Sequence, residues 1–238
     1  MTSAPVSPRA APPLPHHPVT FHRQRDVILL HWRVEPGLVA PLVPAGCRPE
    51  VFDGSAWVGL VAYVFADSTV PPLPPLGRLG TMVEIVVEIL TVDDRGRRGI
   101  AHRSIDTQHL PAVVAARLGI GLPYTPARAG SRWLGDEIAY RSRRRTGVGA
   151  RLRVLPGGAV SPADPLPAFL TERWGVHARH LGRTSWWRLE HPPWALRSAE
   201  VVELDETLLA AAGLAGLASR PPDSVLFTPG GDVRYSRG

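Results

Sequence analysis

The sequence contains no lysine, and all 27 of its basic residues are arginine. This absence excludes a phosphate-binding P-loop, which needs a lysine next to the phosphates. It also excludes an enzyme that traps a carbonyl substrate as a lysine Schiff base, and one that holds pyridoxal phosphate as an internal aldimine. We therefore expect no covalent amine chemistry on a side chain of this protein.

Cysteine and long apolar runs are also scarce. Cys47 is single, so no disulfide can form within the chain, which favours a reducing, cytoplasmic location. No apolar run approaches the length of a bilayer-spanning helix, and we expect no membrane partner. The proline-rich residues 1–18 lack the apolar run of a signal peptide. We expect them to form a disordered leader before a single domain over residues 19–238.

The net charge is +6. Such a charge predicts either an arginine-rich solvated surface or a surface for nucleic acid. The largest cluster, Arg141 with Arg143, Arg144 and Arg145, has no aromatic residues between its arginines. Because proteins that bind single strands combine cations with aromatic stacking platforms, we do not expect a nucleic-acid partner.

Short apolar strands and turn residues dominate the chain, with helices expected only in a few places. Residues 81–92 (TMVEIVVEILTV) alternate cleanly, and Asp53-Gly54 separates two strands as a hairpin turn would. Helices are indicated near residues 110–118 and 165–174. Since strands do not alternate regularly with helices, the sequence predicts a mainly β fold of the α+β type, an antiparallel barrel or sandwich with peripheral helices.

Several titratable residues lie on these strands. Strand periodicity places Arg25, His31 and Arg33 on one face of the first strand, and Glu84 with Glu88 on one face of another. The two glutamates form either a solvated face or, inside a barrel, carboxylates aimed into a cavity. His31 is either a hydrogen-bonded core residue or a ligand-binding one.

No metal or cofactor motif stands out. His177 and His180 are spaced as H-x-x-H, but no cysteine or acidic residue lies at a metal-binding distance in sequence. The chain also lacks the G-x-G-x-x-G, H-E-x-x-H, C-x-x-C and G-x-S-x-G patterns. We therefore expect no metal and no cofactor.

Six blocks of sequence resemble one known family. They are HWRVEPGLVAPLVPAG, FDGSAWVGLV, SIDTQHLPAVVAARLGIGLPY, HPPW, DETLLAAAG and TPGGDV. In this order they resemble the YqjF-like family, a conserved domain of unknown function within the acetoacetate decarboxylase-like superfamily. The resemblance implies a strongly curved antiparallel sheet that forms a cone-shaped barrel around a buried cavity.

The resemblance also implies a site. In the decarboxylase a lysine in the cavity forms a Schiff base with the keto acid, and a second lysine lowers its pKa. Matched through Arg117 and Pro123, these two positions fall on Tyr124 and Thr125 here. The decarboxylase arginine falls on Arg25 and one of its glutamates on Glu84. The place of the second glutamate falls near Gly59, which has no carboxylate.

Three functions remain open on the sequence. The first is a barrel that binds a small molecule with a carboxylate or carbonyl group, held by Arg25, His31, Arg33 and Thr125. The second is an enzyme without Schiff-base chemistry, such as a lyase, hydratase or isomerase for an oxo or hydroxy acid, in which Glu84 and Tyr124 are catalytic. The third is a basic interaction module. Assembly into a homo-oligomer is compatible with each.

Overall fold

Thirteen strands in one sheet make up most of the chain that the structure, a computed structural model, describes (residues 11–72, 74 and 76–238). They are β1 (Thr20–Val34), β2 (Cys47–Pro49), β3 (Ala56–Thr69), β4 (Met82–Asp93), β5 (Arg98–Thr107), β6 (Tyr124–Pro126), β7 (Arg128–Leu134), β8 (Glu137–Arg143), β9 (Gly149–Ala159), β10 (Gly175–His180), β11 (Arg183–Glu190), β12 (Arg197–Glu206) and β13 (Ser224–Arg237).

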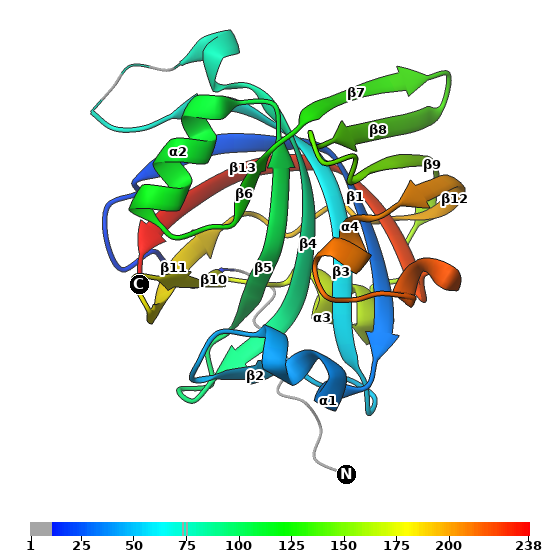
Figure 1. The fold of residues 1–238 in the computed structure, drawn as a ribbon, viewed down its shortest axis with the longest axis horizontal. Coiled ribbons are helices and arrows are strands. Elements are labelled where there is room, and N and C mark those ends of the chain that lie inside the picture. Colours follow the sequence, from blue (N-terminus) through cyan, green and yellow to red (C-terminus); the bar gives the residue numbers. More distant parts are fainter. Residues whose placement is uncertain (1–10, 73, 75) are drawn as a thin grey trace.

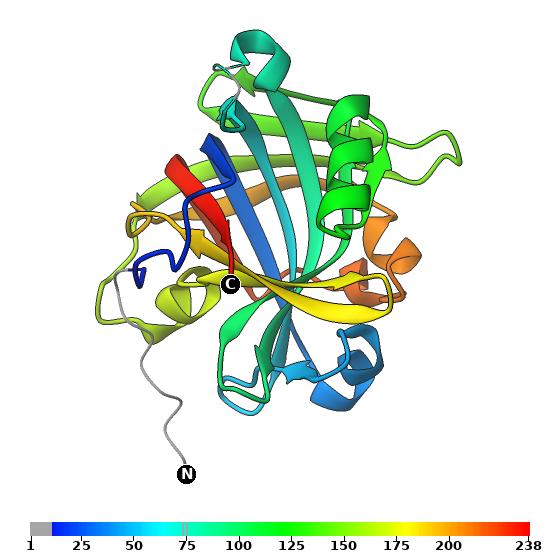
Figure 2. The same cartoon turned by 90° about the vertical axis from the view of Figure 1, so that its left-hand side faces the viewer.

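Seven of these strands close into a barrel. Neighbours pair in the order β1, β3, β4, β5, β10, β11 and β13, and β13 pairs back onto β1. Both views show β1 and β13 side by side (Figures 1 and 2). The pairing is antiparallel except where β5 runs parallel to β10 and β6. This curved sheet confirms the predicted mainly β, decarboxylase-like architecture.

The other long strands extend the sheet away from the barrel. From β13 the order continues through β12, β9 and β8 to β7. The larger apolar core lies between this extension and the outer face of β1, β3 and β4, where Ile28, Leu60 and Ile85 pack with Ile138 and Leu152. The barrel interior has a separate core that includes Leu29, Val61, Val86 and Ile105.

The alternation of β4 decides which residues enter the barrel. Successive side chains of a strand point to opposite faces. Val83, Ile85, Val87 and Ile89 therefore join the outer core, whereas Val86 and Leu90 join the inner one. Glu84 and Glu88 share the inner parity and are 1% and 7% exposed. Both glutamates therefore point into the barrel rather than into solvent, and Glu84 is the one that lines the cavity described below.

The described helices are short, and none of them forms part of the barrel wall. They are α1 (Pro36–Val39), α2 (Leu110–Gly119), α3 (Pro165–Thr171) and α4 (Leu208–Ala211), with 3-10 turns at Ala40–Leu42, Gly77–Gly80 and Leu217–Ser219. Asp164 caps α3 by accepting a hydrogen bond from the Leu166 backbone N–H at 3.0 Å. Side chains of α3 pack into the inner core beside Leu90, and α2 covers the end of the barrel near Glu84.

Two sequence expectations concern the ends and the membrane. Residues 1–10 of the expected leader lie outside the described residues, and residues 11–18 form no helix or strand. The Arg188 side chain donates to the Pro12 carbonyl at 2.8 Å. Among the described residues, none of the helices has the length and apolarity that crossing a bilayer requires.

Candidate functional site

A cavity of about 460 Å³ lies inside the barrel beneath α2. Apolar side chains from β3, β4, β5, α2 and the segment before β4 form most of its lining. The polar side chains that line it are Thr20, Tyr63, Ser68, Glu84, His102, His109, Tyr124 and Tyr235. Among the described residues, the lining contains no arginine and no carboxylate other than Glu84. An apolar space with a few polar groups is typical of sites for small molecules.

Glu84 is held between two tyrosines. Its Oε1 accepts a hydrogen bond from the Tyr124 hydroxyl at 2.6 Å, and its Oε2 accepts one from the Tyr63 hydroxyl at 2.5 Å. Tyr63 is the residue directly opposite Glu84 across β3 and β4, and Tyr124 comes from β6. The carboxyl group therefore has a fixed orientation at the cavity wall.

Burial raises the pKa values of Glu84, Tyr63 and Tyr124. Loss of solvation raises the pKa of Glu84 to about 7, and the two tyrosine hydrogen bonds offset only part of that rise. Burial, together with the nearby Glu84 carboxylate, raises the pKa values of Tyr63 and Tyr124 well above their usual range. The tyrosines are thus hydrogen-bond donors at neutral pH, while Glu84 can gain or lose a proton there.

The segment GIGLPY places Tyr124 at the cavity. After α2 the chain turns at Gly121, whose φ of +80° is a conformation that glycine adopts without strain. A Cβ at Gly121 would also lie 2.6 Å from the Arg179 carbonyl oxygen. Arg117 then donates to the Tyr124 carbonyl at 2.6 Å, and Tyr124 pairs with Ile105 of β5. The glycine and proline residues of this segment therefore direct the Tyr124 phenol into the cavity.

Trp187, Tyr235 and His102 also line the cavity and have unused hydrogen-bonding capacity; the buried Trp187 Nε1 has no partner among the described residues. The Tyr235 hydroxyl makes no hydrogen bond to the residues that the structure describes, although its ring stacks with His22 at 5.5 Å. His102 has a buried Nδ1 with no partner within the same residues, and burial lowers the pKa of its imidazole to about 4. At neutral pH the lining therefore presents a neutral phenol and a neutral imidazole.

A second buried polar cluster lies deeper in the barrel, outside the cavity lining. Glu50 accepts hydrogen bonds from both Arg98 and Arg173, and Arg173 also donates to the Phe169 carbonyl. Burial raises the pKa of Glu88 to about 7 although Arg173 acts in the opposite direction. Four residues of extended strand, about 13 Å, separate Glu88 from Glu84, so the two clusters are distinct.

The structure does not bring Arg25 to Glu84. Arg25 is exposed, and it lies opposite Val64 and Gly230 on the neighbouring strands. The predicted parity fails because Asp26 adopts a φ of +54° at an irregularity between Arg25 and Ile28. One extra residue in a strand reverses which face its side chains point to. The resemblance placed Arg25 and Glu84 in one site, and that expectation is wrong: the partners of Glu84 are the two tyrosines.

The remaining predicted residues have varied environments. His31 is fully buried near Glu88, since a Cβ on Gly59 would lie 3.1 Å from His31 Nε2 and 3.0 Å from Glu88 Cγ. Arg33 lies over the Trp57 ring and pairs with Asp53 at 3.0 Å. Thr125 is half-buried next to Tyr124. Only Glu84 and Tyr124 line the cavity, and their role in binding or catalysis stays a prediction.

Sequence reasoning missed Tyr63, His102 and Tyr235. Tyr63 carried a usable signal, because strand periodicity places it on the same face as Val61 in the strand that follows Asp53-Gly54. Tyr235 carried no usable signal, since Pro229, Gly230 and Gly231 before it are ordinarily loop residues. His102 carried no local signal, because the β5 register shifts between its pairs with Val87 and Glu88.

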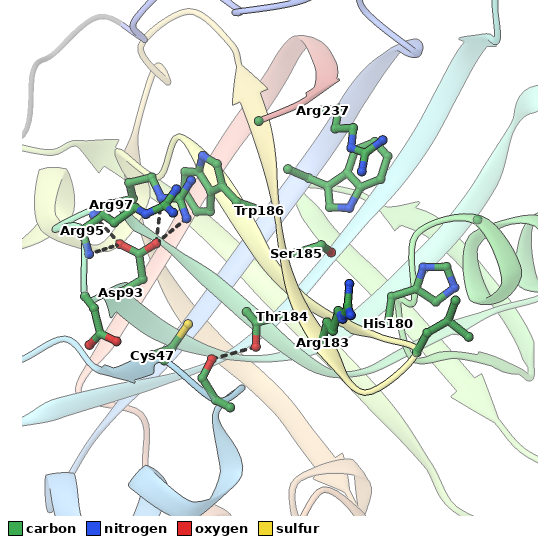
Figure 3. A pocket seen from close by; sticks show the side chains of 17 residues that line it. Cys47, Asp93, Arg95, Arg97, His180, Arg183, Thr184, Ser185, Trp186 and Arg237 are labelled. Atoms are coloured by element: carbon green, nitrogen blue, oxygen red, sulfur yellow. Dashed lines mark hydrogen bonds and ion pairs between the residues drawn. The ribbon is translucent and has the colours of Figure 1, made fainter.

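A second, larger pocket of about 940 Å³ opens on the surface where the β10–β11 hairpin meets β2 and the β4–β5 turn. Figure 3 shows Arg95, Arg97, Arg183 and Arg237 around it, with Asp93 tied to Arg97. Behind this wall, His177 Nδ1 and the Thr91 hydroxyl form a hydrogen bond at 2.8 Å. Within the described part of the chain, the structure has no group of three or more His, Cys, Asp or Glu that could hold a metal.

Several solved structures of the acetoacetate decarboxylase-like type share this fold. The acetoacetate decarboxylase of Legionella pneumophila aligns with a TM-score of 0.66 at 14% identity, over 94% of this chain and 87% of its own. An acetoacetate decarboxylase-like enzyme from Sphingomonas wittichii RW1 gives 0.62 at 15%, over 94% and 92%. The enduracididine biosynthesis enzyme MppR complexed with pyruvate gives 0.56 at 15%, over 92% and 90%. At these identities the likeness establishes the fold alone.

Comparison of amino-acid sequences identifies a relative with higher identity than these structures. The uncharacterized protein YqjF of Bacillus subtilis (strain 168) is 28% identical over 214 residues, which are 86% of this chain and 88% of that protein. Residues 22–232 match the DUF2071 family, described as an uncharacterized conserved protein. This match confirms the resemblance inferred from the six sequence blocks, and the chain therefore belongs to the DUF2071, or YqjF-like, family.

Proposed function

We propose that the chain binds a small, largely apolar molecule that carries a neutral oxygen, such as a ketone or an alcohol, in the cavity beneath α2. One observation carries this proposal. The only carboxyl group in the described lining, Glu84, is held between two tyrosines, and no arginine accompanies it. The Tyr235 hydroxyl, which has no partner among the described residues, is the donor for the ligand oxygen.

The same lining argues against a carboxylate ligand. An anion in this cavity would lie near Glu84 without a cation to compensate it, which is costly in an apolar environment. The alternative that Arg25 holds a carboxylate does not fit, because Arg25 is exposed. Without a lysine anywhere in the chain, the ligand also cannot be held as an imine on a lysine side chain.

A matched pair of ligands tests this proposal. We expect 2-octanone to bind at least about tenfold more tightly than octanoate at pH 7.5, because only the carboxylate must be desolvated without a counter-ion. Isothermal titration calorimetry measures both. Ala116→Phe, which fills the cavity, should abolish binding, Tyr235→Phe should weaken it, and Arg25→Ala should leave it unchanged. Tighter binding of octanoate, or sensitivity to Arg25→Ala, would refute the neutral-ligand proposal.

An enzyme that moves a proton next to a carbonyl is the second candidate, favoured by the raised pKa of Glu84. Glu84 would take a proton from the carbon beside the carbonyl, and the Tyr235 hydroxyl would stabilise the enolate oxygen. The proton then returns to carbon, as an isomerase requires.

Deuterium exchange distinguishes this enzyme from a binding protein. In D₂O, the protein should speed exchange at the carbons next to the carbonyl of 2-octanone, followed by proton NMR. Glu84→Gln should slow that exchange by about a hundredfold or more. Glu88→Gln is the matched control, since Glu88 is also buried but lies outside the lining. If 2-octanone exchanges no faster with the protein than in buffer alone, the protein binds the ketone without catalysing proton transfer.

A further inference from the structure

The outer face of α2 is apolar. Leu110, Val114 and Leu118 are 60%, 57% and 73% exposed. Because residues four apart lie above one another on a helix, these three form one continuous stripe. A surface helix of a globular protein ordinarily turns charged or polar residues toward water. This stripe is therefore suited to contact with another apolar surface.

The face of α2 that points toward the cavity is apolar as well. Ala112, Ala115 and Ala116 line the apolar cavity. The helix has one charged residue, Arg117, and its Nε is directed to the Tyr124 carbonyl at 2.6 Å. The helix is thus apolar both on the side that faces the cavity and on the side that faces outward. It forms a thin wall between the cavity and the outer surface of the protein.

One more exposed apolar residue, Leu181, lies next to this stripe. Leu181, at the tip of the β10–β11 hairpin, is 89% exposed. The hairpin adjoins the C-terminal end of α2, because a Cβ on Gly121 would lie 2.6 Å from the Arg179 carbonyl oxygen. Gly119 and Leu181 line the same surface pocket. Figure 2 shows this hairpin directly below α2 on one side of the molecule.

Positive charge gathers beside these leucines. Arg95, Arg183 and Arg237 line the pocket next to Leu181, are exposed, and form no ion pair with a described residue. Asp94 is the exposed carboxylate of the same lining, so the arginines outnumber it. Figure 3 shows Arg183 and His180 on the hairpin side of this pocket. Such a pocket attracts phosphate groups.

We propose that this face, formed by the stripe, Leu181 and the three arginines, docks on the surface of an anionic lipid bilayer. Apolar side chains enter the boundary between headgroups and acyl chains, and arginines beside them bind anionic headgroups. A second copy fits less well, because a two-fold contact through this face would set arginines against arginines. The proposal departs from the expectation of no membrane partner, and it goes beyond the ligand proposal.

Vesicle flotation tests the docking. The full chain should float with vesicles of equal parts phosphatidylglycerol and phosphatidylcholine, and less with phosphatidylcholine alone or in high salt. Leu118→Glu with Leu181→Glu should weaken binding at least tenfold. Val202→Glu is the matched control, since Val202 is 40% exposed on β12, far from α2 (Figure 1). A triple change of Arg95, Arg183 and Arg237 to Gln should weaken binding only to the anionic vesicles.

Three results would overturn the proposal. They are the absence of flotation by the wild-type chain, flotation that the double leucine variant leaves unchanged, and sedimentation as a dimer that this variant dissociates without any vesicle binding. The last would assign the face to a second copy. Circular dichroism of each variant establishes that it is folded. A chain that binds 2-octanone but ignores vesicles would refute the docking while leaving the ligand proposal intact.

Discussion

Replacing Glu50 with alanine is expected to destabilise the protein by about 3–5 kcal/mol, the usual cost of removing one partner from a buried ion pair. Glu50 accepts hydrogen bonds from Arg98 and Arg173, and Arg173 is 4% exposed. Burial already lowers the pKa of Arg173 to about 10, which shows how poorly its charge is solvated. Without Glu50, that charge stays in the barrel with less compensation.

Urea unfolding at pH 7 measures this loss. Asp232→Ala is the matched control, because it breaks an exposed pair in which Arg23 and Asp232 lie 2.8 Å apart. Water and salt screen the charges of an exposed pair, so the control should change stability little. Equal effects of the two substitutions would mean that water reaches Glu50 and Arg173 and that the deep cluster does not stabilise the barrel.

Glu84→Gln is expected to flatten the dependence of stability on pH between about 4.5 and 7. The folded state holds the Glu84 proton more tightly than the unfolded chain, because its pKa rises to about 7 from 4.5. The stability linked to this proton is complete below pH 4.5 and is lost as pH rises through 7. Relative to the variant, the wild type should lose on the order of 3 kcal/mol across this range.

Comparing the two proteins removes the contributions of other buried groups. Glu88 has its pKa raised in the same direction, whereas His22 and His31 have theirs lowered to about 3 and act oppositely. All three are present in both proteins, so they cancel in the difference. Urea unfolding at four pH values between 4.5 and 7.5 provides the measurement, with exposed Glu200→Gln as control. Parallel curves for wild type and Glu84→Gln would contradict the raised pKa.

The sequence alone predicted the parts of the site that depend on regular strand geometry. The alternation in residues 81–92 placed Glu84 and Glu88 on one face, and the family resemblance indicated that this face meets a cavity. It also placed Tyr124 at the cavity after α2. These predictions succeeded because β4 has no irregularity from Met82 to Val87 against β3 and the turn after α2 is specified by its glycine and proline residues.

The predictions that failed depend on irregular backbone and on distant pairing. Arg25 was assigned to the inner face because nothing in the local sequence reveals the positive φ of Asp26. The length of β13 was missed because Pro229, Gly230 and Gly231 are ordinarily loop residues. Gly230 is required there, since a Cβ would lie 1.9 Å from the Gln24 carbonyl oxygen. Only the partner strand explains such a residue.

The pairing of β1 with β13 has a consequence for how the chain reaches its native state. Arg23 and Asp232, which meet across this seam, are 209 positions apart in the sequence. Pairing of these two strands must therefore overcome the entropy of joining the ends of a very long loop. Contacts of this separation slow folding, because the entropy of loop closure is lost before the contacts stabilise the fold. Until then β1 has one edge unpaired, the arrangement most prone to joining strands of neighbouring chains.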